Sequence, residues 1–144
     1  MKRSCLLALL LSLAAVAAAS GMSPLEHVDV FVSGKDGYTG YRIPAVETTP
    51  DGSLLAFAEA RKHNLSDPGG KGQEIDLVLK RSTDGGATWS PMQLIEHSGE
   101  LWSSANPATV VDHSTGRVLV FYLRCKPGRG TYAAWPGNDD VANL

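Results

Sequence analysis

The chain has 144 residues, a formal net charge of −2, and a composition that is 43% hydrophobic and 19% charged. These values are those of an ordinary globular protein of about one domain. They exclude the strongly basic surface expected of a nucleic-acid-binding protein.

The first twenty residues have the pattern of a secretory signal peptide. Lys2 and Arg3 precede an apolar run over residues 5–19 without a charge, and small residues at 17–20 offer a cleavage site. The run is too short and wrongly flanked for a spanning helix, although a retained anchor is the alternative. Nothing else in the chain is apolar enough to span a bilayer. We therefore expect a signal peptide at residues 1–20, a folded domain at 28–144, and a secreted, periplasmic or lysosomal protein.

The two cysteines do not predict a disulfide. Cys5 leaves with the signal peptide, so Cys125 has no partner in the mature chain. Cys125 lies in an apolar run, which favours a packed core thiol over a nucleophile.

Short apolar runs separated by turn signals fill the rest of the chain. Residues 27–32 alternate, with three valines on one face. The next runs are expected to be strands at 42–48, 54–61, 75–82 and 89–95. The first two are joined by Pro50-Asp51-Gly52, in which proline presets φ and glycine accepts positive φ. No window has a helical period, so the pattern predicts an all-β fold.

The strand pattern then begins again. The four runs from 42 to 95 predict one antiparallel meander, and further strands are expected at 108–112 and 117–124, with a third starting at 141–144 after a loop. A four-stranded unit that restarts is typical of a β-propeller. About one and a half blades leave faces and edges bare. We therefore interpret the chain as an N-terminal piece of a longer protein; a small self-sufficient β-sandwich is the alternative.

The octapeptide at residues 82–89 matches the Asp-box pattern Ser-x-Asp-x-Gly-x-Thr-Trp at every specified position. The matching residues are Ser82, Asp84, Gly86, Thr88 and Trp89. Asp84 is expected to cap backbone N–H groups across the turn, and Gly86 to take a positive φ. Trp89 is expected to anchor the hairpin by burial. The pattern is typical of sialidase-type propeller blades, and its predicted role is structural.

Upstream motifs extend this likeness. The octapeptide is preceded, in this order, by Tyr41-Arg42-Ile43-Pro44, by residues 57–61 ending in Arg61, and by Asp67. This ordered set resembles the opening of exo-α-sialidases (neuraminidases), most of all the lysosomal and bacterial branch. Asn106-Pro107 is similar to a second-blade segment of that family. The resemblance covers residues 28–124. It implies part of a six-bladed propeller that cleaves terminal sialic acid from glycoproteins, glycolipids and oligosaccharides with retention, without a cofactor or metal.

The resemblance also implies roles for three residues. Arg42 matches the first member of the triad of arginines that grips the sugar carboxylate, Arg61 an additional arginine of the site floor, and Asp67 the general acid/base. The chemistry fits, because a guanidinium binds a carboxylate bidentately and stays charged at any working pH. We interpret the Gly/Pro-rich loop of Asp67 as flexible, so that this acid can reach a leaving oxygen.

Each of these residues also has a structural interpretation. Arg42 could be a surface charge, Asp67 a turn former before proline, and Arg61 a partner of Glu59, which shares its strand face. Other polar residues suggest no site. Glu74 and Asp76 are interpreted as solvated strand positions. The histidines at 27, 63, 97 and 113 have no metal-ligand spacing.

The other site residues of the family belong to later blades. These are two further triad arginines, the nucleophilic tyrosine and its glutamate partner; sialidases use a tyrosine in place of a second carboxylate. Tyr38, Tyr41, Tyr122 and Tyr132 are not in the matching context. We therefore expect the chain alone to be inactive. Two other functions stay open: a non-catalytic Asp-box propeller that binds glycans, and a related hydrolase acting on another acidic sugar.

Overall fold

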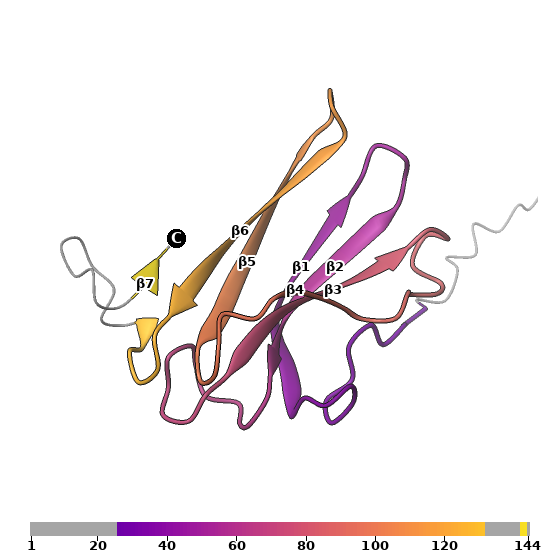
Figure 1. The fold of residues 1–144 in the computed structure, drawn as a ribbon. Coiled ribbons are helices and arrows are strands. Elements are labelled where there is room, and N and C mark those ends of the chain that lie inside the picture. Colours follow the sequence, from indigo (N-terminus) through magenta and orange to yellow (C-terminus); the bar gives the residue numbers. More distant parts are fainter. Residues whose placement is uncertain (1–25, 132–141, 144) are drawn as a thin grey trace, which may run out of the picture.

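A computed structural model describes residues 26–131 and 142–143, so the predicted signal peptide lies outside the described residues. The strands are β1 (Gly40–Thr48), β2 (Leu54–Arg61), β3 (Ile75–Ser82), β4 (Gln93–Glu96), β5 (Ser103–Asp112), β6 (Arg117–Cys125) and β7 (Ala142–Asn143) (Figure 1). The all-β prediction is confirmed. The described ranges contain no helix of a length and apolarity that would let it cross a membrane.

Strands β1 to β4, which we call the first repeat, form the predicted antiparallel meander. β2 and β3 have the predicted bounds and pair without interruption from Leu54↔Ser82 to Arg61↔Ile75. The strand predicted at 89–95 is shorter than expected and lies at 93–96. Trp89 belongs to the preceding turn instead, because its indole N–H donates to the Gly86 carbonyl at 3.1 Å. The alternating residues 27–32 form no strand.

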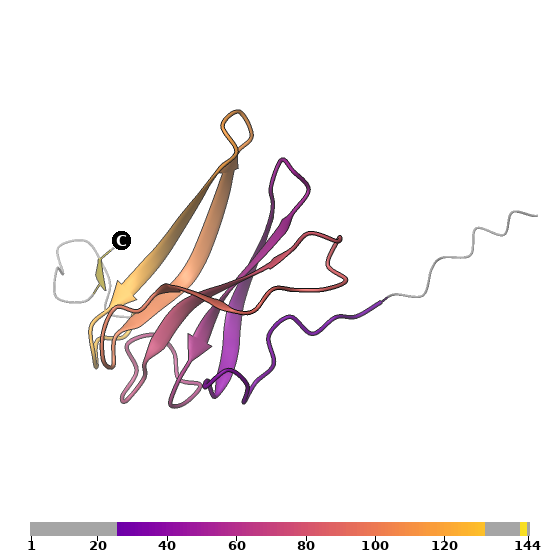
Figure 2. The same ribbon diagram turned by 45° about the vertical axis from the view of Figure 1, so that its right-hand side comes forward.

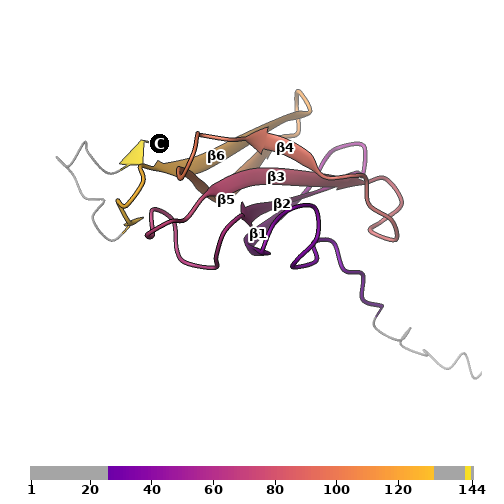
Figure 3. The ribbon, with the colours of Figure 1, turned by 60° about the horizontal axis from the view of Figure 1, so that its bottom comes forward.

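Strands β5 to β7 form the second repeat, and β7 agrees with the third strand predicted near the end of the chain. β5 pairs with β6, β6 pairs with β7, and a single parallel bridge, Ile75↔Ser103, connects β5 to β3. β5 begins five residues before the predicted strand, so Asn106-Pro107 lies within it. Figure 3 shows β1 to β4 side by side with β5 and β6 behind them.

Both repeats have a bulge at the same place in their first strand. The register shifts between Arg42 and Ala45 in β1, and between Ala105 and Ala108 in β5. In each bulge the residue before a proline has a positive φ, 50° at Ile43 and 53° at Asn106. A β-branched residue rarely takes this conformation. Because bulges redirect neighbouring side chains, the bulge in β1 sets the direction in which the Arg42 side chain leaves the strand.

A buried cluster of Ala58, Ala60 and Val78 in the first repeat packs against Phe31, Tyr38, Tyr41 and Met92, whereas one face of the second repeat is bare. Phe57, Ile75 and Leu77 are buried in the first repeat. On the outer face of β5 and β6, Val110, Leu119 and Phe121 are 52%, 48% and 58% exposed. The structure thus has the bare apolar sheet face predicted for an incomplete set of blades.

The octapeptide turn between β3 and β4 has the expected capping. Asp84 accepts the Thr88 backbone N–H at 2.9 Å, and the Ser82 hydroxyl both donates to Asp84 and accepts the Gly86 N–H. Gly86 has a φ of 96°. Trp89 is half-buried, so it anchors the turn through its indole hydrogen bond as well as by burial.

Three aspartates in turns are expected to make the stability of the fold sensitive to acid. Neighbouring hydroxyl groups lower the pKa of Asp51, Asp84 and Asp112 from 3.8 to about 2. The hydroxyl donors belong to Thr49, Thr88 and Ser114, respectively. Because each folded-state pKa is depressed, the stabilisation is present above the unfolded pKa and is lost as pH falls toward 2.

We therefore expect the urea midpoint of the chain to fall between about pH 5 and pH 2.5. Replacing all three aspartates with asparagine should lower the midpoint at the higher pH and flatten this dependence. Equal pH dependence in the triple variant and the parent chain would contradict the assignment.

Candidate functional site

Two arginines and the loop aspartate converge at one end of the first repeat. Arg42 Nη1 lies 3.1 Å from Asp67 Oδ1, and Arg61 Nη1 lies 3.5 Å from the same oxygen. The side chains of Arg42 and Asp67 are 48% and 76% exposed, whereas that of Arg61 is fully buried. The β2–β3 loop lies at the end opposite the tips of the β1–β2 and β5–β6 hairpins (Figures 1 and 2). At this end the accessible guanidinium of Arg42 therefore lies beside the accessible carboxylate of Asp67.

The buried Arg61 holds the loop that carries Asp67. Its Nε and Nη2 donate to Glu59 Oε2 at 3.0 and 2.6 Å, and its Nη1 donates to the carbonyls of Leu65 and Ser66. The structural alternative for Arg61, pairing with Glu59, is therefore confirmed. Its substrate-binding role stays a prediction, and the observed contacts give it a positioning role.

Glu59 extends this ion pair to the second repeat. Its side chain is fully buried, and Oε1 accepts the backbone N–H of Asn106 at 2.9 Å. Asn106 is the positive-φ residue of the β5 bulge. One carboxylate thus orients Arg61 and anchors the neighbouring repeat, a link that could not be read from the spacing of residues 59 and 61.

The loop over residues 62–74 is braced by several hydrogen bonds, which its interpretation as flexible did not anticipate. The buried side chain of Gln73 donates to the carbonyls of Asn64 and Ser66, while Pro68 and Gly69 are themselves buried. Glycine and proline content indicated a loop correctly, but it does not show which side chains bind the loop backbone from below. Asp67 projects from a fixed support.

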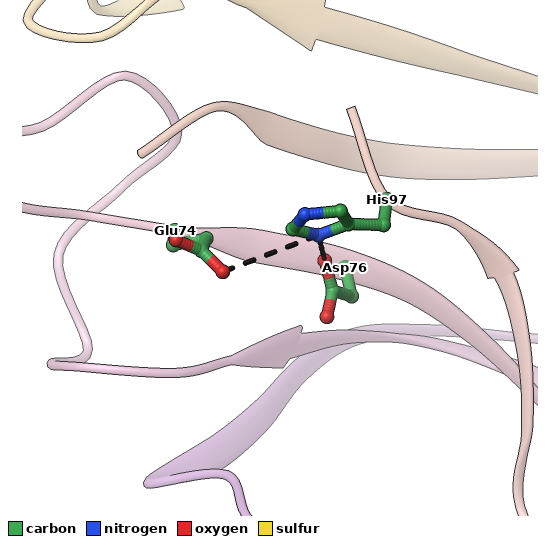
Figure 4. Close-up of side chains that lie close together, drawn as sticks. All are labelled: Glu74, Asp76 and His97. Carbon is green, nitrogen blue, oxygen red and sulfur yellow. Dashed lines mark hydrogen bonds and ion pairs between the residues drawn. The ribbon is translucent and has the colours of Figure 1, made fainter. Parts of the chain in front are cut away.

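A second polar cluster corrects another prediction. Glu74 and Asp76 are buried rather than solvated, and they lie with His97 in a group whose ligand atoms are within 4.8 Å of one another (Figure 4). His97 Nδ1 is 2.7 Å from Asp76 Oδ1 and 4.0 Å from Glu74 Oε1. The cluster joins β3 to the segment after β4, a proximity that sequence spacing did not indicate.

Protein groups occupy this cluster. The Lys62 ammonium contacts Glu74 Oε1 at 2.6 Å, and the Leu101 N–H donates to Oε2; the Tyr38 hydroxyl donates to Asp76 at 2.6 Å. Burial alone would raise the pKa of Glu74, but the hydrogen bonds from Lys62 and Leu101 outweigh it and lower that pKa. With its carboxylates partnered and an ammonium beside them, the cluster is a structural network rather than a cation site.

A small pocket adjoins Arg42. Its volume is ≈ 180 Å³, and it is lined by Phe31, Tyr41, Arg42, Pro44 and Ala58. The rings of Phe31 and Tyr41 lie 5.1 Å apart, which gives the pocket an aromatic wall beside the guanidinium.

The described phenols and thiol are not activated as nucleophiles. Burial, as the largest cause, raises the pKa of Tyr38 well above 10, that of Tyr41 to about 12, and also that of Tyr122. Burial raises the pKa of Cys125 to about 11, which agrees with the predicted core thiol. Tyr132 lies outside the described residues. Within residues 26–131, no tyrosine has the lowered pKa that favours nucleophilic attack.

Comparison with known proteins gives several related sequences. The chain is 34% identical over 123 residues to a sialidase of Micromonospora viridifaciens, which covers 83% of this chain and 18% of that protein. It is 37% identical over 109 residues to an exo-alpha-sialidase of Arthroderma benhamiae, which covers 71% and 24%, respectively. None of the protein-family models compared with the chain matches it. The chain spans about a fifth of the length of these curated relatives.

Solved structures show the same architecture. The Hadza microbial sialidase Hz136 superposes with a TM-score of 0.61 at 27% identity, covering 76% of this chain and 23% of that one. A leech intramolecular trans-sialidase superposes with a TM-score of 0.66 at 21% identity, covering 86% and 22%, and this second likeness concerns the fold alone.

Proposed function

Because this chain belongs to the sialidase family, we propose that it forms the N-terminal part of a secreted exo-α-sialidase that hydrolyses terminal sialic acids of glycoconjugates. The observation that supports the proposal best is the 3.1 Å contact between Arg42 and Asp67, both of which are accessible. The family resemblance implied that these two side chains serve one sugar, and they meet at one end of the sheet.

Arg42 is proposed to bind the carboxylate of the sugar. A half-exposed guanidinium can turn from Asp67 to a ligand carboxylate and donate two parallel hydrogen bonds to it. The bond to Asp67 costs little to exchange, because exposed ion pairs contribute about 0–1 kcal/mol.

Asp67 is proposed to act as the general acid/base at the glycosidic oxygen. Its carboxylate is 76% exposed on a braced loop, so it is both accessible and fixed in position. Acid/base catalysis needs a donor within hydrogen-bond reach of the leaving oxygen, which this arrangement allows for a sugar held by Arg42.

We propose that the chain alone is inactive. The described tyrosines have raised pKa values, and Arg42 by itself does not supply the three-arginine carboxylate clamp that the family resemblance implies. The covalent step therefore needs residues from the longer protein. The proposal involves no metal and no cofactor.

A titration tests the proposed sugar site. We expect sialic acid to shift the NMR signals of Arg42 and residues 66–69 with a Kd of about 1 mM or weaker, since one charged contact carries the affinity. The methyl ester of sialic acid, which lacks the negative charge, should not shift them. Equal responses to the acid and the ester would contradict the role of Arg42. Turnover of a fluorogenic sialoside by the purified chain would contradict the proposed inactivity.

The second candidate function is glycan binding without hydrolysis, which the accessible guanidinium of Arg42 beside an aromatic-walled pocket also supports. A chimera distinguishes the two candidate functions. In it, the residues of this chain replace the aligned segment of the Micromonospora viridifaciens sialidase. Hydrolysis by the chimera supports the sialidase proposal. A chimera that unfolds cooperatively and binds sialic acid, but does not hydrolyse sialosides, supports the binding function instead.

A further inference from the structure

The second repeat contacts the loop that carries Asp67. The Gly69 N–H donates to Ser103 Oγ at 3.1 Å, and the Ser103 side chain is fully buried at the start of β5. Ser103 also forms the parallel bridge to Ile75, where the two repeats join. A buried hydroxyl of the second repeat thus holds the backbone two residues after the proposed acid.

A turn of the second repeat presses against the same glycine. A Cβ atom built on Gly69 would lie 1.9 Å from the carbonyl oxygen of Arg129 and 2.9 Å from the nitrogen of Gly130. Real Cβ atoms do not approach so closely, and backbone atoms cannot move aside as a flexible side chain can. Gly69 therefore marks direct backbone contact between the loop and the turn at 126–130.

The first repeat holds the loop from the other side. Arg61 of β2 donates to the carbonyls of residues 65 and 66, and Gln73, within the loop and next to β3, donates to those of residues 64 and 66, just before Asp67. Asp67 thus lies between a segment fixed by the first repeat and a glycine fixed by the second.

We propose that the second repeat positions Asp67 through Ser103 and the backbone of residues 129–130, which act on it through Gly69. In this arrangement the carboxylate of Asp67 meets Arg42 only while the two repeats are docked. The inference rests on the proposed function only for the role of Asp67 as the general acid/base. The contact between the loop and the second repeat can be tested without an activity assay.

Two glycines of the loop provide a matched test. Gly69 and Gly72 both have positive φ, 72° and 65°, so alanine is strained at either position; only at Gly69 does the added Cβ meet backbone. We expect Gly69→Ala to raise amide hydrogen exchange of residues 66–70, of which Pro68 has no amide hydrogen, about tenfold or more. It should also abolish the NOEs between the Arg42 side chain and the Asp67 β protons. Gly72→Ala should leave both at their parent values.

A second variant removes only the hydrogen bond. Ser103→Ala should raise exchange of residues 66–70 about tenfold and weaken the same NOEs, while the amides of β2 and β3 keep their protection. Protection of 66–70 that is unchanged in both Gly69→Ala and Ser103→Ala would overturn the inference. So would equal effects of Gly69→Ala and Gly72→Ala, or faster exchange spread over the whole sheet. Failure of sialic acid binding with these loop results intact would count against the proposed function and not against this inference.

Discussion

Replacing Glu59 with alanine is expected to lower the free energy of unfolding by about 3–5 kcal/mol, the usual cost of breaking a buried ion pair from one side. The change leaves the fully buried guanidinium of Arg61 without its two bonds to Glu59. It also deprives the Asn106 N–H of its acceptor and so removes one of the contacts between the two repeats. Urea unfolding followed by circular dichroism measures the loss.

Two further variants check this interpretation. Asp36→Asn removes an exposed negative charge 3.7 Å from Lys80 and keeps a residue type that tolerates the φ of 56° at this position, so it should change stability by less than about 0.5 kcal/mol. Replacing both Glu59 and Arg61 with apolar residues should cost less than Glu59→Ala, because no uncompensated charge stays buried. A double variant less stable than Glu59→Ala would show that packing, rather than the unpaired charge, dominates at this position.

Replacing Arg42 with alanine is expected to weaken sialic acid binding about 10- to 100-fold, the effect of losing a hydrogen-bonded charge pair worth about 1.5–3 kcal/mol. For the isolated chain, this change puts the affinity below the range of the NMR titration. Arg42→Lys should give an intermediate affinity, because an ammonium keeps the charge but lacks the planar fork.

The chain offers a matched control for Arg42. Arg81 is 47% exposed and lies 3.0 Å from Asp51, but it pairs in register with Leu55 at the other end of β2. Arg81→Ala should leave sialic acid affinity unchanged, and an equal loss in both variants would indicate non-specific attraction of the anion. Asp67→Asn should raise the affinity for sialic acid a few-fold, because it removes the exposed carboxylate that competes with the ligand for Arg42.

The sequence by itself determined the strand pattern, the turns and the family. An apolar run predicted the bounds of β2 and alternating apolar residues predicted those of β3, because hydrogen-bonded neighbours on both sides keep these strands regular. Residues 27–32 alternate but form no strand, so alternation alone does not decide whether a segment pairs with a sheet. The proximity of Arg42 and Asp67 was inferred from the family resemblance, since no local pattern relates residues 25 positions apart.

Only the tertiary structure decided how the site is supported. The burial of Arg61 and its bonds to Glu59 depend on how the strands align. The contact of Gly69 with Ser103 and with the turn at 126–130 joins segments that are far apart in the sequence. Glu74 and Asp76 became buried for the same reason, since the segment after β4 places His97 beside them. Local sequence sets backbone preference and hydrophobic period, whereas burial and long-range hydrogen bonding depend on which surfaces meet when the repeats pack.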